Sequence, residues 1–148
     1  MAETLGMLCD KLTIIKLKQY HTTDEVRLQS LGSQSLQMQE EIDEYIADAV
    51  SGKIPIQKLS FASNKVFKAE GNSIDEVKGQ IGKVFYQLAD VNCRLWHEQE
   101  KVYEFHTVPA EQKDIVVKKL ALLNLERNQC IDSINTSFIE LITKTKDN

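Results

Sequence analysis

Apolar residues recur at intervals of three and four positions along most of the chain, which is the spacing of one face of an α-helix. The third segment with this spacing is the most regular: its apolar positions run from Ile74 to Phe105 and are interrupted only at Glu98. Such spacing is typical of helices packed in a bundle, so the pattern predicts an all-α four-helix bundle with long helices and one longer crossover segment. The expected helices cover residues 3–21, 23–50, 73–105 and 109–143.

The predicted crossover, residues 52–72, separates the two halves of the chain. Gly52 is placed to end the second helix, and Pro55 breaks the helical pattern, so we expect an irregular stretch or one short helix here. Ser73 and Glu76 form a capping box, which predicts where the third helix begins. A connection of this length serves either as a packed crossover between helices or as a binding loop.

Polar residues interrupt the apolar faces of the third and fourth predicted helices. Glu98 lies on the face of the third helix, and Asn124 and Arg127 lie on the face of the fourth. The short turn between these helices makes them antiparallel, which brings Asn124 close to Asn92 and leaves Glu98 about 10 Å from Asn124 along the axis. A direct Glu98–Arg127 bridge is therefore not expected, and Lys11 of the first helix is the candidate partner for Glu98.

Three explanations of this polar layer are open. A buried charge is costly unless it is paired and hydrogen-bonded, so the polar side chains could form an ion-pair and amide network that fixes the helix register. They could instead gather around a ligand in the interior of the bundle. The third explanation is that the apolar face is slightly misassigned and that Glu98 lies in solvent.

Length, charge and cysteine content narrow the class of protein. The chain has 148 residues and a net charge of −4, and we expect residues 1–148 to form a single helical domain. An acidic chain is not expected to bind nucleic acid. We find neither an apolar run of the roughly 18 residues that a membrane span needs nor a secretory signal. Cys9, Cys93 and Cys130 are widely spaced, as expected for free thiols in the cytoplasm.

Three stretches resemble an uncharacterised family of small bacterial helical proteins. LGMLCDKLTIIKLKQYH (residues 5–21) is similar to the opening helix of that family, which carries an Asp-Lys-Leu-Ser/Thr-Ile motif. LADVNCRLWHEQEKVYEF (residues 88–105) resembles its Val-Asn-x-x-Leu-Trp-x-x-Glu segment, and LALLNLERNQCIDSIN (residues 120–135) resembles its closing helix. The chain departs from the family after the Trp: an acidic pair followed by arginine is usual there, whereas this chain has Glu-Gln-Glu-Lys at residues 98–101.

The resemblance implies a context and a set of residues, but no reaction. Members of the family are often encoded near glycosyltransferases, which implies a role connected with bacterial surface polysaccharides. Trp96 is either a core residue or a stacking surface for a sugar or a base. The motif positions and Glu98 from the helical pattern together give the candidate ligand-binding residues: Asp10, Lys11, Asn92, Trp96, Glu98, Asn124 and Arg127. Asp10 and Lys11 could equally form a surface ion pair.

These observations favour a non-catalytic cytoplasmic bundle that binds a small ligand or a protein partner through its polar layer. No cofactor is expected, and no residue is assigned a catalytic role. Ile14 and Leu17 make the first helix apolar on more than one face. We therefore expect this helix either at the centre of the bundle or at a contact between two copies of the chain, which would form a homo-oligomer.

The alternative is a Mg²⁺-dependent enzyme. QEEIDEY (residues 39–45) and LADVN (residues 88–92) are similar to helical nucleoside triphosphate pyrophosphohydrolases, which hold Mg²⁺ with carboxylates on two helices. The chemistry requires oxygen ligands, and Glu41, Glu44 and Asp90 are the matching positions. Gln87 stands where a further carboxylate is expected, and the acidic residues of the first motif are equally typical of a solvated helical face.

Overall fold

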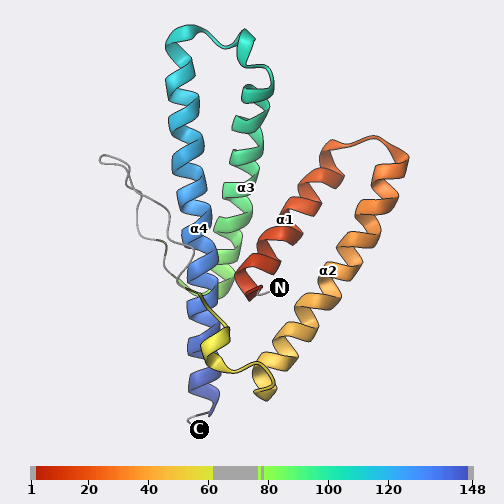
Figure 1. The fold of residues 1–148 in the computed structure, drawn as a ribbon, viewed down its shortest axis with the longest axis vertical. Coiled ribbons are helices and arrows are strands. Elements are labelled where there is room, and N and C mark those ends of the chain that lie inside the picture. The colour runs from red at the N-terminus through yellow and green to blue at the C-terminus, as the bar shows by residue number, and fades with distance from the viewer. Residues whose placement is uncertain (1–2, 62–76, 78, 147–148) are drawn as a thin grey trace.

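The computed structural model describes residues 3–61, 77 and 79–146 of the chain. Within these residues it contains no β-strand, which confirms the predicted all-α four-helix bundle (Figure 1). The long helices are α1 (Leu5–His21), α2 (Glu25–Ser51), α3 (Ile81–Tyr103) and α4 (Ala110–Lys146), with short 3-10 helices η1 (Ile56–Lys58) and η3 (Phe105–Thr107). Over the same residues, none of the helices is long and apolar enough to cross a membrane.

The helices form two hairpins, α1–α2 and α3–α4, and α1 joins them (Figure 1). α1 packs against the other three long helices, so it occupies the central place that was one of the two positions expected from its two apolar faces. α2 packs chiefly against α1 and leans away from the second hairpin toward the α1–α2 turn. Near its C-terminal end it also reaches α4, where the rings of Tyr45 and Phe138 lie 6.4 Å apart.

Local capping fixes where the first two helices begin and end. The hydroxyl of Thr4 accepts a hydrogen bond from the backbone N–H of Met7 at the start of α1. The carboxylate of Asp24 accepts two from the first turn of α2, at 2.9 and 3.1 Å. Gly52 ends α2 with a φ of 86°, the left-handed conformation that glycine adopts most easily, as the sequence predicts.

The third helix begins later than expected. α3 starts at Ile81, and neither Val77 nor Gly79 is helical. Gly79 has a φ of 136°, a backbone conformation that no helix contains. The capping box proposed at residues 73–76 lies outside the described residues, as does most of the crossover predicted at 52–72. Where the crossover is described, it contains η1 and a fully buried Leu59, so its first part is packed against the core.

The buried face of α4 differs from the predicted one. The spacing of three and four that contains Asn124 and Arg127 also places Val117 and Leu141 on the predicted core face, but they are 55% and 54% exposed, whereas Val116 and Ile142 are buried. α4 contacts α3 at Lys119 and Glu126 and contacts α1 at Arg127 and Asn135, so its buried face turns along the helix. Asn124 is also exposed rather than part of the core.

The crossing of α1 and α4 requires a glycine. The backbone N–H of Gly6 donates a 2.8 Å hydrogen bond to Oδ1 of Asn135, and both residues are buried. A Cβ atom at position 6 would lie 2.4 Å from the carbonyl oxygen of Ile131. The two backbones therefore approach more closely than any residue with a side chain would allow.

We predict that Gly6→Ala destabilises the protein by about 1–3 kcal/mol in chemical denaturation, because the added methyl group must push α1 away from α4. Gly32→Ala is the matched control: its Cβ would meet nothing within 4 Å, so the better helix former should leave stability unchanged or raise it by about 0.5–1 kcal/mol. Equal effects of the two substitutions would contradict the close approach.

Candidate functional site

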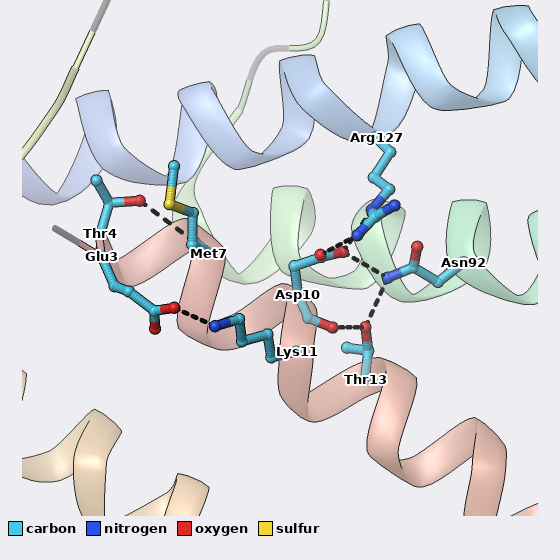
Figure 2. Close-up of polar contacts among 8 residues, drawn as sticks. All are labelled: Glu3, Thr4, Met7, Asp10, Lys11, Thr13, Asn92 and Arg127. Carbon is cyan, nitrogen blue, oxygen red and sulfur yellow. Dashed lines mark hydrogen bonds and ion pairs between the residues drawn. The ribbon is translucent and has the colours of Figure 1, made fainter. Parts of the chain in front are cut away.

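Asp10 of α1 is the centre of a buried polar network that joins three helices (Figure 2). The guanidinium of Arg127, on α4, donates from Nε to Oδ1 at 2.9 Å and from Nη2 to Oδ2 at 2.5 Å. Asn92 of α3 donates from Nδ2 to the same Oδ1 at 2.9 Å and to the hydroxyl of Thr13 at 2.6 Å. That hydroxyl in turn donates to the backbone carbonyl of Asp10 at 2.8 Å.

Burial and charge make this network a structural device. Asp10 and Asn92 are 4% and 3% exposed, so neither of them could remain unpaired without a large desolvation penalty. The hydrogen bonds to Asp10 raise the pKa of Arg127 above its already high value, against the opposing effect of burial. The paired, fork-like geometry fixes the rotation of α4 relative to α1. Asp10 is therefore not part of a surface ion pair with Lys11, which was one of the two alternatives that the sequence left open.

Lys11 and Glu98 are not partners, contrary to expectation. Lys11 is instead paired with Glu3, which lies just before the start of α1 (Figure 2). Glu98 is only 7% exposed, which rules out a position in solvent, and its Oε1 lies 3.2 Å from Nζ of Lys101 and 4.0 Å from Nζ of Lys119. The residues of the predicted polar layer therefore lie in two separate clusters, one around Asp10 and one around Glu98.

Four of the candidate residues line one small cavity beside the Asp10 network. This cavity, of about 180 Å³, lies between α1, α3 and α4. Asn92, Trp96, Asn124 and Arg127 contribute to its wall, and the rest comes from Ile14, Leu17, Leu95 and Gln99. The expected proximity of Asn124 to Asn92 is consistent with this lining.

Trp96 also lines a larger cavity, of about 440 Å³, near the α1–α2 turn. The Trp96 indole lies parallel to the His21 ring, with 4.8 Å between ring centroids and an interplanar angle of 9°. Its Nε1 donates a 2.8 Å hydrogen bond to Glu100, which holds the indole in place. The remaining lining residues are Lys18, Thr22, Arg27, Ser30, Leu31 and Gln34. We call the two spaces that share Trp96 the Trp96 cavities.

The sequence-based candidates did not include Thr13 and His21, although α1 carried a signal for them. Asp10, Thr13, Leu17 and His21 recur at intervals of three and four, so they share one helical face. That face is distinct from the apolar stripe that defined the helix, and it turns toward α3 and α4. Lys18 and Arg27 carried no such signal, because their neighbourhood depends on how the α1–α2 turn is placed.

Two of the cysteines are in environments that disfavour nucleophilic chemistry. Burial, with a smaller contribution from Asp10, raises the pKa of the Cys9 thiol to about 11. Burial raises the pKa of Cys130 to about 12, with Glu126 adding to the effect. A thiol must ionise to act as a nucleophile, so these two remain protonated near neutral pH. All three cysteines are free, and only Cys93 is exposed.

The carboxylates of the alternative Mg²⁺ site are not assembled. Glu41 and Glu44 line a cavity of about 600 Å³ between α1, α2 and η1, to which Glu3 and Lys11 also contribute. Asp90 lies on α3 and is paired with Arg94 at 3.1 Å. Throughout the described ranges, no group of three or more His, Cys, Asp or Glu side chains is arranged to hold a metal ion. The structure therefore does not bring Glu41, Glu44 and Asp90 together as a metal-binding group.

The fold and the site define an all-α protein with a structural polar junction and adjacent cavities. No protein-family model matches the chain, and neither a curated protein nor a solved structure does.

We predict that Arg127→Lys costs about 1.5 kcal/mol of unfolding free energy, because lysine retains the charge but loses one of two charged hydrogen bonds to Asp10. Arg94→Lys serves as the control, since Arg94 also contacts two carboxylates but is half-exposed, and a change under about 0.5 kcal/mol is expected. If urea denaturation gives the same small change for both, the Asp10–Arg127 pair is not a specific junction.

Proposed function

We propose that this chain is a non-catalytic bacterial cytoplasmic protein that binds a small anionic molecule with a planar ring or a sugar in the Trp96 cavities. The function is supported by one juxtaposition above all: stacked aromatic rings next to basic side chains. His21 and Trp96 form one wall of the larger cavity, while Lys18 and Arg27 line it as well. Aromatic rings stack on bases and sugars, and basic side chains pair with phosphate or carboxylate groups.

Local charge supports an anionic ligand. The whole chain carries a net charge of −4, yet among the residues that the structure describes no carboxylate lines either of the Trp96 cavities. Lys18 and Arg27 bring two positive charges to the larger cavity, and Ser30 and Gln34 bring neutral hydrogen-bonding groups. At about 440 Å³ the cavity falls within the ordinary size range of small-molecule sites.

The Asp10 network supports binding indirectly. It holds Asn92 and Arg127 in fixed positions at the wall of the smaller cavity. A wall held in this way is preorganised, so a ligand would lose less affinity to the ordering of side chains. The role proposed for the polar layer is therefore to build the site rather than to contact the ligand through every member.

The resemblance to proteins encoded near glycosyltransferases suggests which anions to test first. Nucleoside diphosphate sugars combine a planar base, a sugar and a diphosphate, the three features that the Trp96 cavities would accommodate. A role in the context of bacterial surface polysaccharides is part of this proposal, and the free cysteines are in keeping with a reducing cytoplasm.

A protein partner is the second candidate. α2 packs chiefly against α1 and leaves Val26, Leu36 and Val50 mostly exposed. Exposed apolar side chains on one helix can mark a contact with another protein or a second copy of the chain. A negative result in the ligand test below would favour this protein-partner function.

Trp96 is the single tryptophan of the chain, so its fluorescence reports directly on the cavities. We expect UDP-glucose to change this fluorescence in a saturable way, and uridine or glucose alone to have little effect. Lys18→Ala should weaken binding about tenfold or more, because a charged hydrogen bond is lost. Lys16→Ala is the matched control, since Lys16 lies on the opposite side of α1 and lines neither cavity.

Binding of UDP-glucose should also weaken as salt is raised, because Lys18 and Arg27 are exposed to solvent and their charges are screened. A flat titration with UDP-glucose and with ADP, or equal affinity for uridine and UDP-glucose, would contradict an anion site at Trp96. In that case sedimentation of the purified chain would test the second candidate, with self-association as the expected result.

A further inference from the structure

Glu98 has one buried carboxylate oxygen that no described residue hydrogen-bonds. The Glu98 side chain is 9% exposed and lies on the core face of α3. Its Oε1 lies 3.2 Å from Nζ of Lys101 and 4.0 Å from Nζ of Lys119. Its Oε2 is buried and has no hydrogen-bond donor among the described residues. A buried acceptor in this condition is unfavourable, and a donor from outside the chain would satisfy it.

A cavity lies beside this carboxylate. It has a volume of about 540 Å³ and is formed by one face of α3 and one face of α4. The lining residues are Cys93, Arg94, His97, Glu98, Lys119, Leu122 and Leu123. None of them lines the Trp96 cavities, so this space is a separate site. Leu122 and Leu123 give it an apolar wall that a ring or short aliphatic body would cover.

The charges around the cavity decide what kind of donor fits. Lys101 and Lys119 already offset the charge of Glu98. Arg94 also lines the cavity, and it is engaged by Asp90 at 3.1 Å and by Glu126 at 2.8 Å. A further cation would meet these positive groups, with His97 beside them, at close range. An uncharged donor would instead pair with Oε2 without that repulsion.

We propose that the α3–α4 cavity binds an uncharged molecule that combines an apolar body with one hydroxyl or amide donor, and that this donor pairs with Oε2 of Glu98. The Lys119 side chain is more than half exposed, so its head group can move aside while the ligand's apolar body rests on the leucines. This site is distinct from the anion site proposed above, and neither depends on the other.

A comparison of phenol with anisole distinguishes recognition of the hydrogen-bond donor from recognition of the ring. Both have the same aromatic body, but only phenol carries an O–H group. We would titrate each into the full chain and follow the backbone amide resonances of Leu122 and Leu123 by NMR. Phenol should shift these resonances in a saturable way and bind at least about tenfold more tightly than anisole, because a hydrogen bond to a charged group is involved.

Two variants of Glu98 assign the effect to the carboxylate. Glu98→Leu should weaken phenol about tenfold and leave anisole unchanged, while Glu98→Gln, which retains the shape, should give a smaller loss for phenol. Glu140→Leu is the control, because Glu140 is an exposed residue of α4 outside the cavity, and it should bind phenol as the natural chain does.

Three results would overturn the proposal. Equal binding of phenol and anisole would show that no donor is recognised, and unchanged phenol binding in Glu98→Gln and Glu98→Leu would show that Glu98 is not the acceptor. Tighter binding of benzylamine than of phenol would show that the site selects a cation. None of these results bears on the UDP-glucose titration, which reports on different residues.

Discussion

The arrangement of the helices depends on the hydrogen bonds that the carboxylate of Asp10 accepts. It receives two hydrogen bonds from Arg127 of α4 and one from Asn92 of α3, so a single side chain of α1 connects the two hairpins. Because Asp10 is almost fully buried, removing Arg127 would leave its Oδ2 without the donor that now pairs with it, while Oδ1 would keep the bond from Asn92. Apolar packing alone would allow α1 to rotate or slide against α3 and α4, whereas these hydrogen bonds can form in only one register.

Other features are consistent with this anchor. One turn before Asp10, Gly6 allows the backbones of α1 and α4 to approach closely. About three turns beyond Asp10 on the same face, His21 meets Trp96, so the register of α1 also places the rings of the Trp96 cavities. α2 depends on α1 for most of its contacts, so its position follows from the same anchor.

The fold class was predictable from periodicity, because long amphipathic segments leave few alternatives to helices. The start of α3 was not, since apolar spacing continues through Gly79 although its backbone has left the helical region. For the site, motif resemblance selected Asp10, Asn92 and Arg127, but their bonding could not be read from one helical face at a time. Glu98 was correctly assigned to the core, yet its partners are Lys101 on the same helix, at 3.2 Å, and Lys119 of α4, at 4.0 Å, rather than Lys11.

A double-mutant cycle with Asp10→Ala, Arg127→Ala and the combined variant tests the central role of Asp10 most directly. Unfolding free energies from urea denaturation would give the coupling energy between the two side chains. A buried, two-bond pair predicts a coupling of about 2 kcal/mol or more, with the combined variant much more stable than the sum of the single losses implies. Additive losses, with a coupling near zero, would show that the two side chains act independently and that Asp10 does not anchor the bundle.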